Sequence, residues 1–408
     1  MLHAFLKRFI RVGDLQVRLP DGRIETYGDG TGPRVAVKLT ARGARQIAAK
    51  PEVGTGEAYM DGGLVIEAGD IWQLLELAGR NNRSSGRRSA LAKALAAARR
   101  RLEQWNHRNA ARRNVAHHYD LSHDLYRRFL DPDMQYSCAY FVRPDMTLEE
   151  AQFAKKAHIA AKLRLEPGMK VLDIGCGWGG LGLYLGAHHD VEVLGVTLSQ
   201  EQLAIAQRRA GDAGLEDRVR FSLTDFRDVR GPFDRIVSVG MFEHVGAPFF
   251  LEYFQDVERL LTDDGVALIH SIGRRSSPGL TNAWIRKYIF PGGYIPAISE
   301  TIAAVEQTGL WVTDVEILRL HYAETLKHWR LRFWAEREEI ARLYDERFCR
   351  MWEFYLACSE YGFIYGENFN FQLQLTKKVG VLPMTRDYML DDERSGSMAA
   401  QPQIQAAE

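Results

Sequence analysis

The stretch VLDIGCGWGG, residues 171–180, decides the fold of this chain. It places Asp173 before three glycines in the pattern D-x-G-x-G-x-G, after an apolar run typical of a strand and before a run typical of a helix. Glycines allow a tight turn and a close approach of the backbone to a ligand, and the following helix N-terminus can meet polar ligand groups. The pattern predicts a ligand-binding turn at the carboxyl end of a strand.

Strand-like and helix-like runs alternate beyond this turn. A helix is predicted over residues 199–214, and strands are predicted over residues 169–175, 191–197, 218–223, 234–240 and 265–273. Strands that alternate with helices at this spacing indicate an α/β fold with a doubly wound, mostly parallel, Rossmann-like sheet.

The class of ligand follows from the ends of the next two strands. A dinucleotide-binding protein would have G-x-G-x-x-G and an acidic residue after the second strand, whereas this chain reads GVTLSQEQ over residues 195–202. The third strand ends at Asp225 and Phe226, a carboxylate for an adenine amino group and a ring to stack on it. Together these features resemble the S-adenosylmethionine-dependent methyltransferase fold. A glycine turn without a ligand is the alternative.

Composition and patterning limit the remaining chain. With 408 residues, 46% hydrophobic and 26% charged, the chain is long enough for two or three domains, and its net charge of zero argues against a protein devoted to nucleic acid. No apolar run approaches the roughly 18 residues of a membrane-spanning helix. Residues 14–78 alternate strand-like runs with turns, which predicts a small α+β module. The four cysteines form no metal-binding pattern, so no metal is expected.

A basic segment follows this module. Residues 79–113 contain eleven Lys or Arg residues and one Glu, in a sequence that favours an amphipathic helix. A contact with anionic lipid and a solvated connecting helix are the two main interpretations, and contact with RNA is a weaker third.

Six further blocks identify a family. They are HYDLS (118–122), MQYSCAYF (134–141), GMFEHVG (240–246), LIHSIG (268–273), FPGGYIP (290–296) and HYAETL (321–326). With these blocks the chain resembles the cyclopropane-fatty-acyl-phospholipid synthases, from the N-terminal module to about residue 390. The resemblance implies methyl transfer to a cis double bond of a phospholipid acyl chain, a carbocation on that chain, and loss of a proton as a cyclopropane ring closes. Rings of Phe242, Tyr140, Tyr294 and Phe363 are candidates to stabilise the cation.

The resemblance also implies two sets of site residues. A bicarbonate ion, the base for the proton, would be held by Cys138, Glu243, His270, the backbone of Ile272, and Tyr322. S-adenosylmethionine would be bound by Tyr136, Ser137, Asp173, Gly175, Gly177, Gly179, Thr197, Gln202, Asp225 and Phe226. His117, His118 and His244 are expected to be structural.

Organisation and partners complete the expectations. The predicted parts are a lipid-associated module (1–80), a basic helical linker (81–114), a catalytic domain (115–391) and a disordered tail (392–408). We expect a cytoplasmic protein, peripheral on the inner face of an anionic phospholipid membrane, with no nucleic-acid partner and a homodimeric state. The alternatives are methyl- or methylene-branched products, a small non-lipid acceptor, and a non-catalytic lipid-binding protein.

Overall fold

The computed structural model describes residues 2–82 and 123–398, which form two compact units. The first contains the described residues of Met1–Ala97, Leu280–Pro291 and Leu326–Asn368. The second contains those of Ala98–Gly279, Gly292–Thr325 and Phe369–Glu408. Among the described helices, none is both long and apolar enough to cross a membrane.

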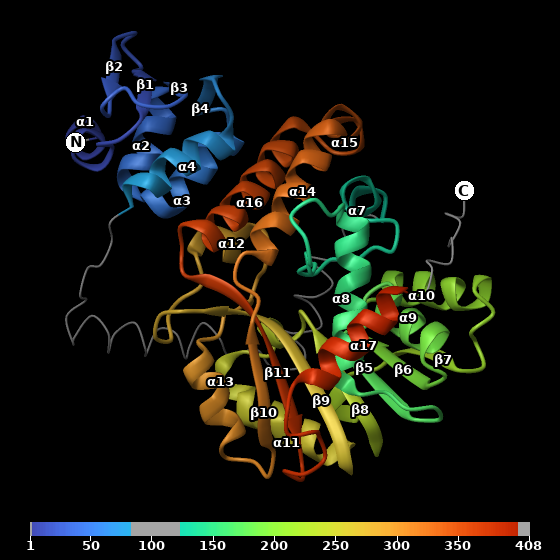
Figure 1. Cartoon of the computed structure of the whole chain (residues 1–408). Helices are drawn as coiled ribbons and strands as arrows, with labels where there is room; N and C mark the ends of the chain where they lie inside the picture. Colours follow the sequence, from blue (N-terminus) through green and yellow to red (C-terminus); the bar gives the residue numbers. More distant parts are fainter. Residues whose placement is uncertain (1, 83–122, 399–408) are drawn as a thin grey trace. The chain divides into compact units, whose positions relative to one another are not determined.

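The second unit is built on a seven-stranded sheet of order β10-β11-β9-β8-β5-β6-β7 (Figure 1). Neighbouring strands from β9 to β7 are parallel, whereas β10 and β11 are antiparallel. The strands are β5 (Lys170–Ile174), β6 (Glu192–Thr197), β7 (Val219–Leu223), β8 (Phe233–Val239), β9 (Leu261–Arg274), β10 (Trp311–Ile317) and β11 (Asn368–Thr376). The predicted α/β fold with a mostly parallel sheet is confirmed.

Helices cover both faces of this sheet. Successive strand residues point to opposite sides, and apolar side chains on each side must be buried. On β5, Val171 packs in a core with α8, α9 and α10, whereas Leu172 packs in a second core with α11 and α13. Both faces being buried explains the near-continuous apolar runs in the strands. The helices are α7 (His123–Phe129), α8 (Leu148–Leu163), α9 (Gly180–His188), α10 (Gln200–Asp212), α11 (Phe250–Leu260), α13 (Ile298–Val305) and α17 (Asp387–Met398).

The first unit has a four-stranded sheet of order β2-β1-β3-β4, flanked by helices. Its N-terminal elements are α1 (Leu2–Phe9), β1 (Asp14–Arg18), β2 (Ile24–Tyr27), β3 (Arg34–Leu39), α2 (Ala41–Ala49), α3 (Pro51–Met60), β4 (Leu64–Ala68) and α4 (Ile71–Asn81). A turn at Gly22, whose φ is +85°, joins β1 to β2 as the Pro-Asp-Gly sequence predicts.

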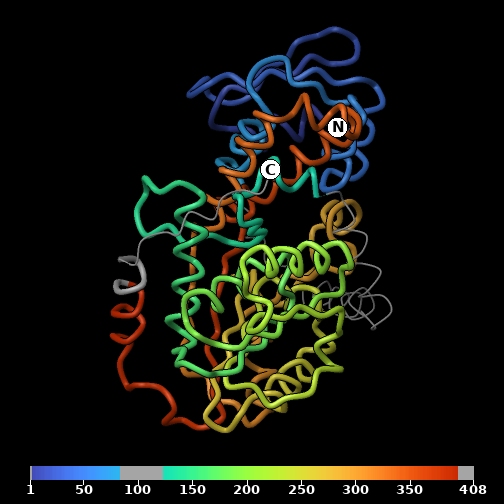
Figure 2. Tube along the Cα trace, turned by 90° about the vertical axis from the view of Figure 1, so that its right-hand side faces the viewer, coloured from blue at the N-terminus to red at the C-terminus, as the bar shows by residue number. Residues whose placement is uncertain are grey.

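Later segments of the chain complete this first unit. They are α12 (Ala283–Tyr288), most of α14 (His321–Ala335), α15 (Arg337–Leu343) and α16 (Glu346–Ile364). Helix α16 packs on α3 and α4, and Tyr59 of α3 donates a hydrogen bond of 2.9 Å to Glu353 of α16. In Figure 2 the orange trace of these helices runs among the blue N-terminal residues.

Two predicted boundaries differ from this organisation. The predicted continuous domain 115–391 contains residues 280–291 and 326–368, which belong to the first unit because α12 packs on α3, and α16 packs on α3 and α4. The predicted disordered tail starts at residue 392, but α17 continues to Met398 and packs along α8 (Figure 1). Most of the predicted basic linker (81–114) lies outside the described residues, and so do His117 and His118.

Candidate active site

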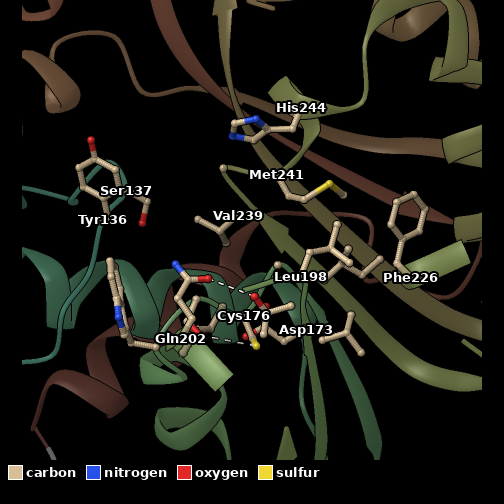
Figure 3. Close-up of a pocket in the computed structure, with 18 of the residues that line it drawn as sticks. Tyr136, Ser137, Asp173, Cys176, Leu198, Gln202, Phe226, Val239, Met241 and His244 are labelled. Atoms are coloured by element: carbon tan, nitrogen blue, oxygen red, sulfur yellow. Dashed lines mark hydrogen bonds between the residues drawn. The ribbon is translucent and has the colours of Figure 1, made fainter. Parts of the chain in front are cut away.

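A pocket lies in the second unit where β5, β6, β7 and β8 end (Figure 3). The glycine turn forms its floor: Gly175 and Cys176 donate from their backbone nitrogens to the Val196 oxygen at 2.9 and 3.0 Å. Gly175 has a φ of +82°, and a Cβ there would come within 3.0 Å of the Met241 side chain. The turn therefore requires glycine both for its backbone conformation and for space.

The acid of the turn is buried beneath the pocket. Asp173 is 2% exposed, and its Oδ2 has no hydrogen-bond partner among the described residues. Burial raises the pKa of this carboxyl to about 7, against the opposing effect of the Lys155 ammonium. An unpartnered buried carboxylate oxygen in a pocket wall suits a ligand that brings N–H or O–H donors, as the amino-acid and ribose parts of S-adenosylmethionine do.

The end of β6 offers a polar amide. Thr197 donates to Gln202 Oε1 at 3.1 Å, and Figure 3 shows the Gln202 amide nitrogen on the pocket side. At the end of β7, the side chain of Phe226 lines the pocket. Asp225 also lines it, but Arg227 holds both carboxylate oxygens at 2.8 and 2.7 Å. The carboxylate keeps further lone pairs for a ligand amino group.

The structure brings the predicted cofactor residues together. Tyr136 and Ser137 form part of the pocket wall, contributed by the loop between α7 and α8. Every predicted cofactor residue lines the pocket except Gly179, which is the N-cap of α9 with a φ of +84°. Its role is to let the turn enter the helix.

The pocket also contains residues that the sequence did not single out for it: Gln135, Lys155, Met241, Phe249 and Tyr253. His244, expected to be structural, lines it as well, and burial lowers the pKa of His244 to about 4. Its position three residues after Met241, in the segment that directly follows β8, is the signal that could have found it.

Two of the predicted bicarbonate residues, Glu243 and Ile272, contact each other beside this pocket. Glu243 lies in the short 3₁₀ helix η2 (Phe242–His244), between the pocket-lining residues Met241 and His244. The Ile272 backbone nitrogen donates to Glu243 Oε1 at 2.7 Å, and Glu243 Oε2 has no hydrogen-bond partner among the described residues. Burial raises the pKa of Glu243 to about 7, so both protonation states are accessible near neutrality.

His270, two residues before Ile272 on β9, has protein partners at both ring nitrogens. Asn370 Nδ2 lies 3.0 Å from Nε2, and Gln372 Nε2 lies 3.2 Å from Nδ1. Burial lowers the pKa of His270 to about 3, so the ring is neutral. It is also 1% exposed.

The remaining two residues lie on a loop and a helix that meet. Cys138 is fully buried and donates to the Ala139 oxygen at 3.3 Å, and burial raises the pKa of its thiol. The Ala139 nitrogen donates at 3.0 Å to Thr325, one turn after Tyr322 on α14. The five residues fit a bound anion in part. Glu243 Oε2 has no partner among the described residues and can donate to an anion when it is protonated. The Ile272 N–H and both ring nitrogens of His270, in contrast, already have partners.

The expected cation-stabilising rings do not line the pocket. Tyr140 is stacked between His158 and His321, with ring centroids 4.1 and 4.9 Å away, and Phe242 packs against Phe250. Tyr294 donates to Glu300 at 2.5 Å, and Phe363 belongs to the first unit. The rings that do line the pocket belong to Tyr136, Trp178, Phe226, Phe249 and Tyr253.

Comparisons with known proteins agree with this architecture. Residues 106–373 match a family model described as mycolic acid cyclopropane synthetase, and residues 1–90 match one described as a domain of unknown function. The chain is 49% identical over 243 residues to the cyclopropane-fatty-acyl-phospholipid synthase of Escherichia coli strain K12, a match that covers 59% of this chain and 62% of that enzyme.

A second relative is matched over more of its length. The tuberculostearic acid methyltransferase UfaA1 of Mycobacterium tuberculosis is 38% identical over 363 residues, 86% of this chain and 84% of that protein. Among solved structures, mycolic acid cyclopropane synthase CmaA1 complexed with S-adenosylhomocysteine (SAH) and CTAB matches with a TM-score of 0.61 and 37% identity, covering 65% of this chain and 97% of that one.

Proposed function

Because the chain belongs to the mycolic acid cyclopropane synthetase family, we propose that it uses S-adenosylmethionine to convert the cis double bond of a phospholipid acyl chain into a cyclopropane ring. The observation that carries the proposal is the position of Glu243, a buried acid with one unpartnered oxygen, between two residues of the glycine-turn pocket. A cofactor pocket that adjoins a buried acid suits methyl transfer followed by proton removal.

The first chemical step needs no base in the protein. When bound, S-adenosylmethionine supplies an electrophilic methyl group, and an alkene has no acidic proton to remove before it reacts. The chain's own residues hold the cofactor, exclude water and face the positive charge that develops on the acyl chain. Aromatic rings of the pocket, such as Phe249 and Tyr253, supply negative ring faces for this purpose.

Ring closure requires removal of a proton from the transferred methyl group. When bound, bicarbonate would supply a base for that proton. Glu243, whose Oε2 has no partner among the described residues, would contact it, and Cys138 and Tyr322 would complete its shell. The Ile272 N–H and the His270 ring would join only by exchanging their present partners. Protonated Glu243 can donate from Oε2, whereas ionised Glu243 keeps the Ile272 N–H as its donor. We assign Glu243 the role of orienting the base.

A phospholipid acceptor implies a membrane surface. The segment 79–113 carries a net charge of +10, which favours docking on anionic lipid. We therefore place the enzyme at the inner face of the membrane, as a peripheral protein. The family resemblance, and not the charge, is the basis on which we propose a homodimer.

Lipid mass spectrometry tests the proposal. Purified protein is incubated with S-adenosylmethionine and liposomes of cis-monounsaturated phospholipid, and the lipids are analysed before and after mild hydrogenation. A gain of one CH₂ that resists hydrogenation is expected. No gain, with SAH binding demonstrated by calorimetry, would exclude the phospholipid acceptor and leave a small-molecule acceptor to be tested without liposomes.

A methyl- or methylene-branched acyl chain is the second candidate product. It is favoured by the likeness to the tuberculostearic acid methyltransferase, which extends over 86% of this chain. The same experiment separates the products. A methylene-branched chain gains CH₂ and takes up two hydrogens on hydrogenation, whereas a cyclopropane ring gains CH₂ and stays unchanged. A saturated methyl branch, which needs a reductant, already differs from the ring by two hydrogens before hydrogenation.

A further inference from the structure

A buried lysine lines the cofactor pocket without a role in the reaction proposed above. Lys155 lies on α8, is 1% exposed, and donates from Nζ to Gln135 Oε1 at 2.6 Å and to Ser137 Oγ at 2.7 Å. Among the described residues, its hydrogen-bond partners are both neutral oxygens. A buried ammonium is costly unless an anion compensates it, so this site lacks a directly bound anion.

The nearby acids do not take that place. Asp133 is held by Lys156 and Arg209. Asp131 accepts from the Gln135 backbone nitrogen at 2.9 Å, and burial raises the pKa of its carboxyl to about 6. Both acids act on Lys155 through space, without a hydrogen bond to it among those described, and burial lowers the pKa of Lys155 to about 8. The ammonium can therefore still bind an anionic ligand in the pocket.

Ser137 extends this positive site into the pocket. Its hydroxyl oxygen accepts from the ammonium, so the hydroxyl hydrogen is left to donate to another group. Ser137 and Tyr136 stand together in the pocket wall (Figure 3). An ammonium has three N–H donors, and the two contacts described use two of them.

The same pocket contains the buried carboxyl of Asp173. The lining of the pocket thus includes an acid, and an ammonium with a polarised hydroxyl. This pair complements a zwitterion, and the amino-acid part of an S-adenosyl cofactor carries one ammonium and one carboxylate.

We propose that Lys155 binds the carboxylate of the cofactor's amino-acid part, through its third N–H and through the hydroxyl of Ser137. The inference rests on the proposed function, since it requires an S-adenosyl cofactor in this pocket. It assigns Lys155 to binding and leaves the acid-base chemistry to the residues around Glu243.

Isothermal titration calorimetry with two ligands tests the inference. SAH contains the carboxylate, whereas 5′-methylthioadenosine lacks the whole amino-acid part. Lys155→Met, which keeps an unbranched side chain that ends one atom short of the ammonium, should weaken SAH binding about 10-fold to 100-fold, the effect of a lost charge-assisted hydrogen bond. Binding of 5′-methylthioadenosine should change less than about twofold, because the ligand does not reach the ammonium.

Lys162→Met is the matched control. Lys162 lies on the same helix, is 2% exposed, and donates to Gln372 at 2.7 Å and to Glu316, away from the pocket. Its substitution should leave the ratio of the two affinities unchanged. An unchanged ratio in Lys155→Met would overturn the inference, and so would an equal change of the ratio in both variants.

A measurement on the unaltered protein guards against a variant that does not fold. SAH is compared with its decarboxylated analogue, and we expect SAH to bind at least about 10-fold more tightly. Equal affinities would overturn the inference while leaving the proposed function intact. Failure of the unaltered protein to bind SAH at all would instead overturn the proposed function.

Discussion

Burial sets the protonation of the acidic residues in the site. Glu243 and Asp173 each have one carboxylate oxygen without a partner among the described residues, and burial raises the pKa of each to about 7. These carboxyls are consequently poised between two charge states at neutral pH, which is a recurrent property of functional sites.

Substitution of Glu243 should separate catalysis from binding. Glu243→Gln keeps the shape of the side chain but cannot be ionised, so we expect turnover to fall by at least about 100-fold. SAH affinity should stay within about threefold, because Glu243 does not line the cofactor pocket. Lipid mass spectrometry gives the turnover and calorimetry gives the affinity. Equal losses of both would contradict the assigned role.

The same variant should alter the pH dependence of stability. Folded Glu243 has a pKa of about 7, above the 4.5 of an ordinary Glu, so the folded state binds the proton more tightly than the unfolded state does. This proton binding contributes fully to stability below pH 4.5, and the contribution is lost as the pH rises through 7. When the pH rises from 5 to 8, the free energy of unfolding of Glu243→Gln should therefore increase by on the order of 1–3 kcal/mol relative to that of the original protein. Urea denaturation at both pH values measures the difference. A difference independent of pH would show that the carboxyl is not buried as described.

Among the elements, the glycine turn is held to its shape by tight packing. Gly179→Ala would bring a Cβ within 2.7 Å of Phe221, whereas Gly168→Ala, at a similar positive φ of +79°, would meet nothing within 4 Å. We expect Gly168→Ala to lower the free energy of unfolding by about 1 kcal/mol through backbone strain alone. Gly179→Ala should lower it by a further 1–3 kcal/mol or so and weaken SAH binding. Urea denaturation and calorimetry provide both values, and equal behaviour of the two variants would refute the packing argument.

Helix α17 is tied to the sheet unit by a histidine. His158 contacts Glu393 of α17 and Glu316 of β10, the latter at 2.7 Å. Burial lowers the pKa of His158, but these two carboxylates outweigh it and the pKa is raised overall. The resulting stability is present when His158 is protonated and is lost as the pH rises through its raised pKa.

Glu393→Gln should reduce both the pKa and this stability. We expect a loss of about 1 kcal/mol at pH 6 and a smaller loss at pH 9, where His158 is neutral in either protein. NMR titration of His158 and denaturation at both pH values are the measurements. A loss that is the same at both pH values would show that the ion pair contributes nothing.

Elements that have a characteristic pattern within their own sequence could be predicted, whereas contacts that depend on tertiary packing could not. The glycine turn and the five strands have their own patterns, and Asp173, the three glycines and Thr197 lie within them. Lys155 and Phe249 reach the pocket from helical segments whose orientation depends on tertiary packing. Tyr140 was misassigned for the same reason, since only the fold shows that two histidine rings cover its faces.

At the scale of the whole molecule, the sequence shows an uneven distribution of charge: residues 79–113 carry +10, although the net charge of the chain is zero. Reversing the charges of Arg99, Arg100 and Arg101 should weaken binding to anionic liposomes by about tenfold or more, since each basic residue contributes about 1 kcal/mol at such a surface. Flotation with liposomes of different anionic content measures the binding. Neutral liposomes serve as the control, and unchanged binding to anionic liposomes would remove the docking proposal.

The strand order has a consequence for synthesis of the protein. β11 lies between β9 and β10 although it follows both in the chain. This part of the sheet can therefore form only after β11 has been synthesised. Asn370 and Gln372, the partners of His270, are on this late strand. A nascent chain can thus assemble the glycine turn first, but the surroundings of His270 are completed only when residues 368–376 have left the ribosome.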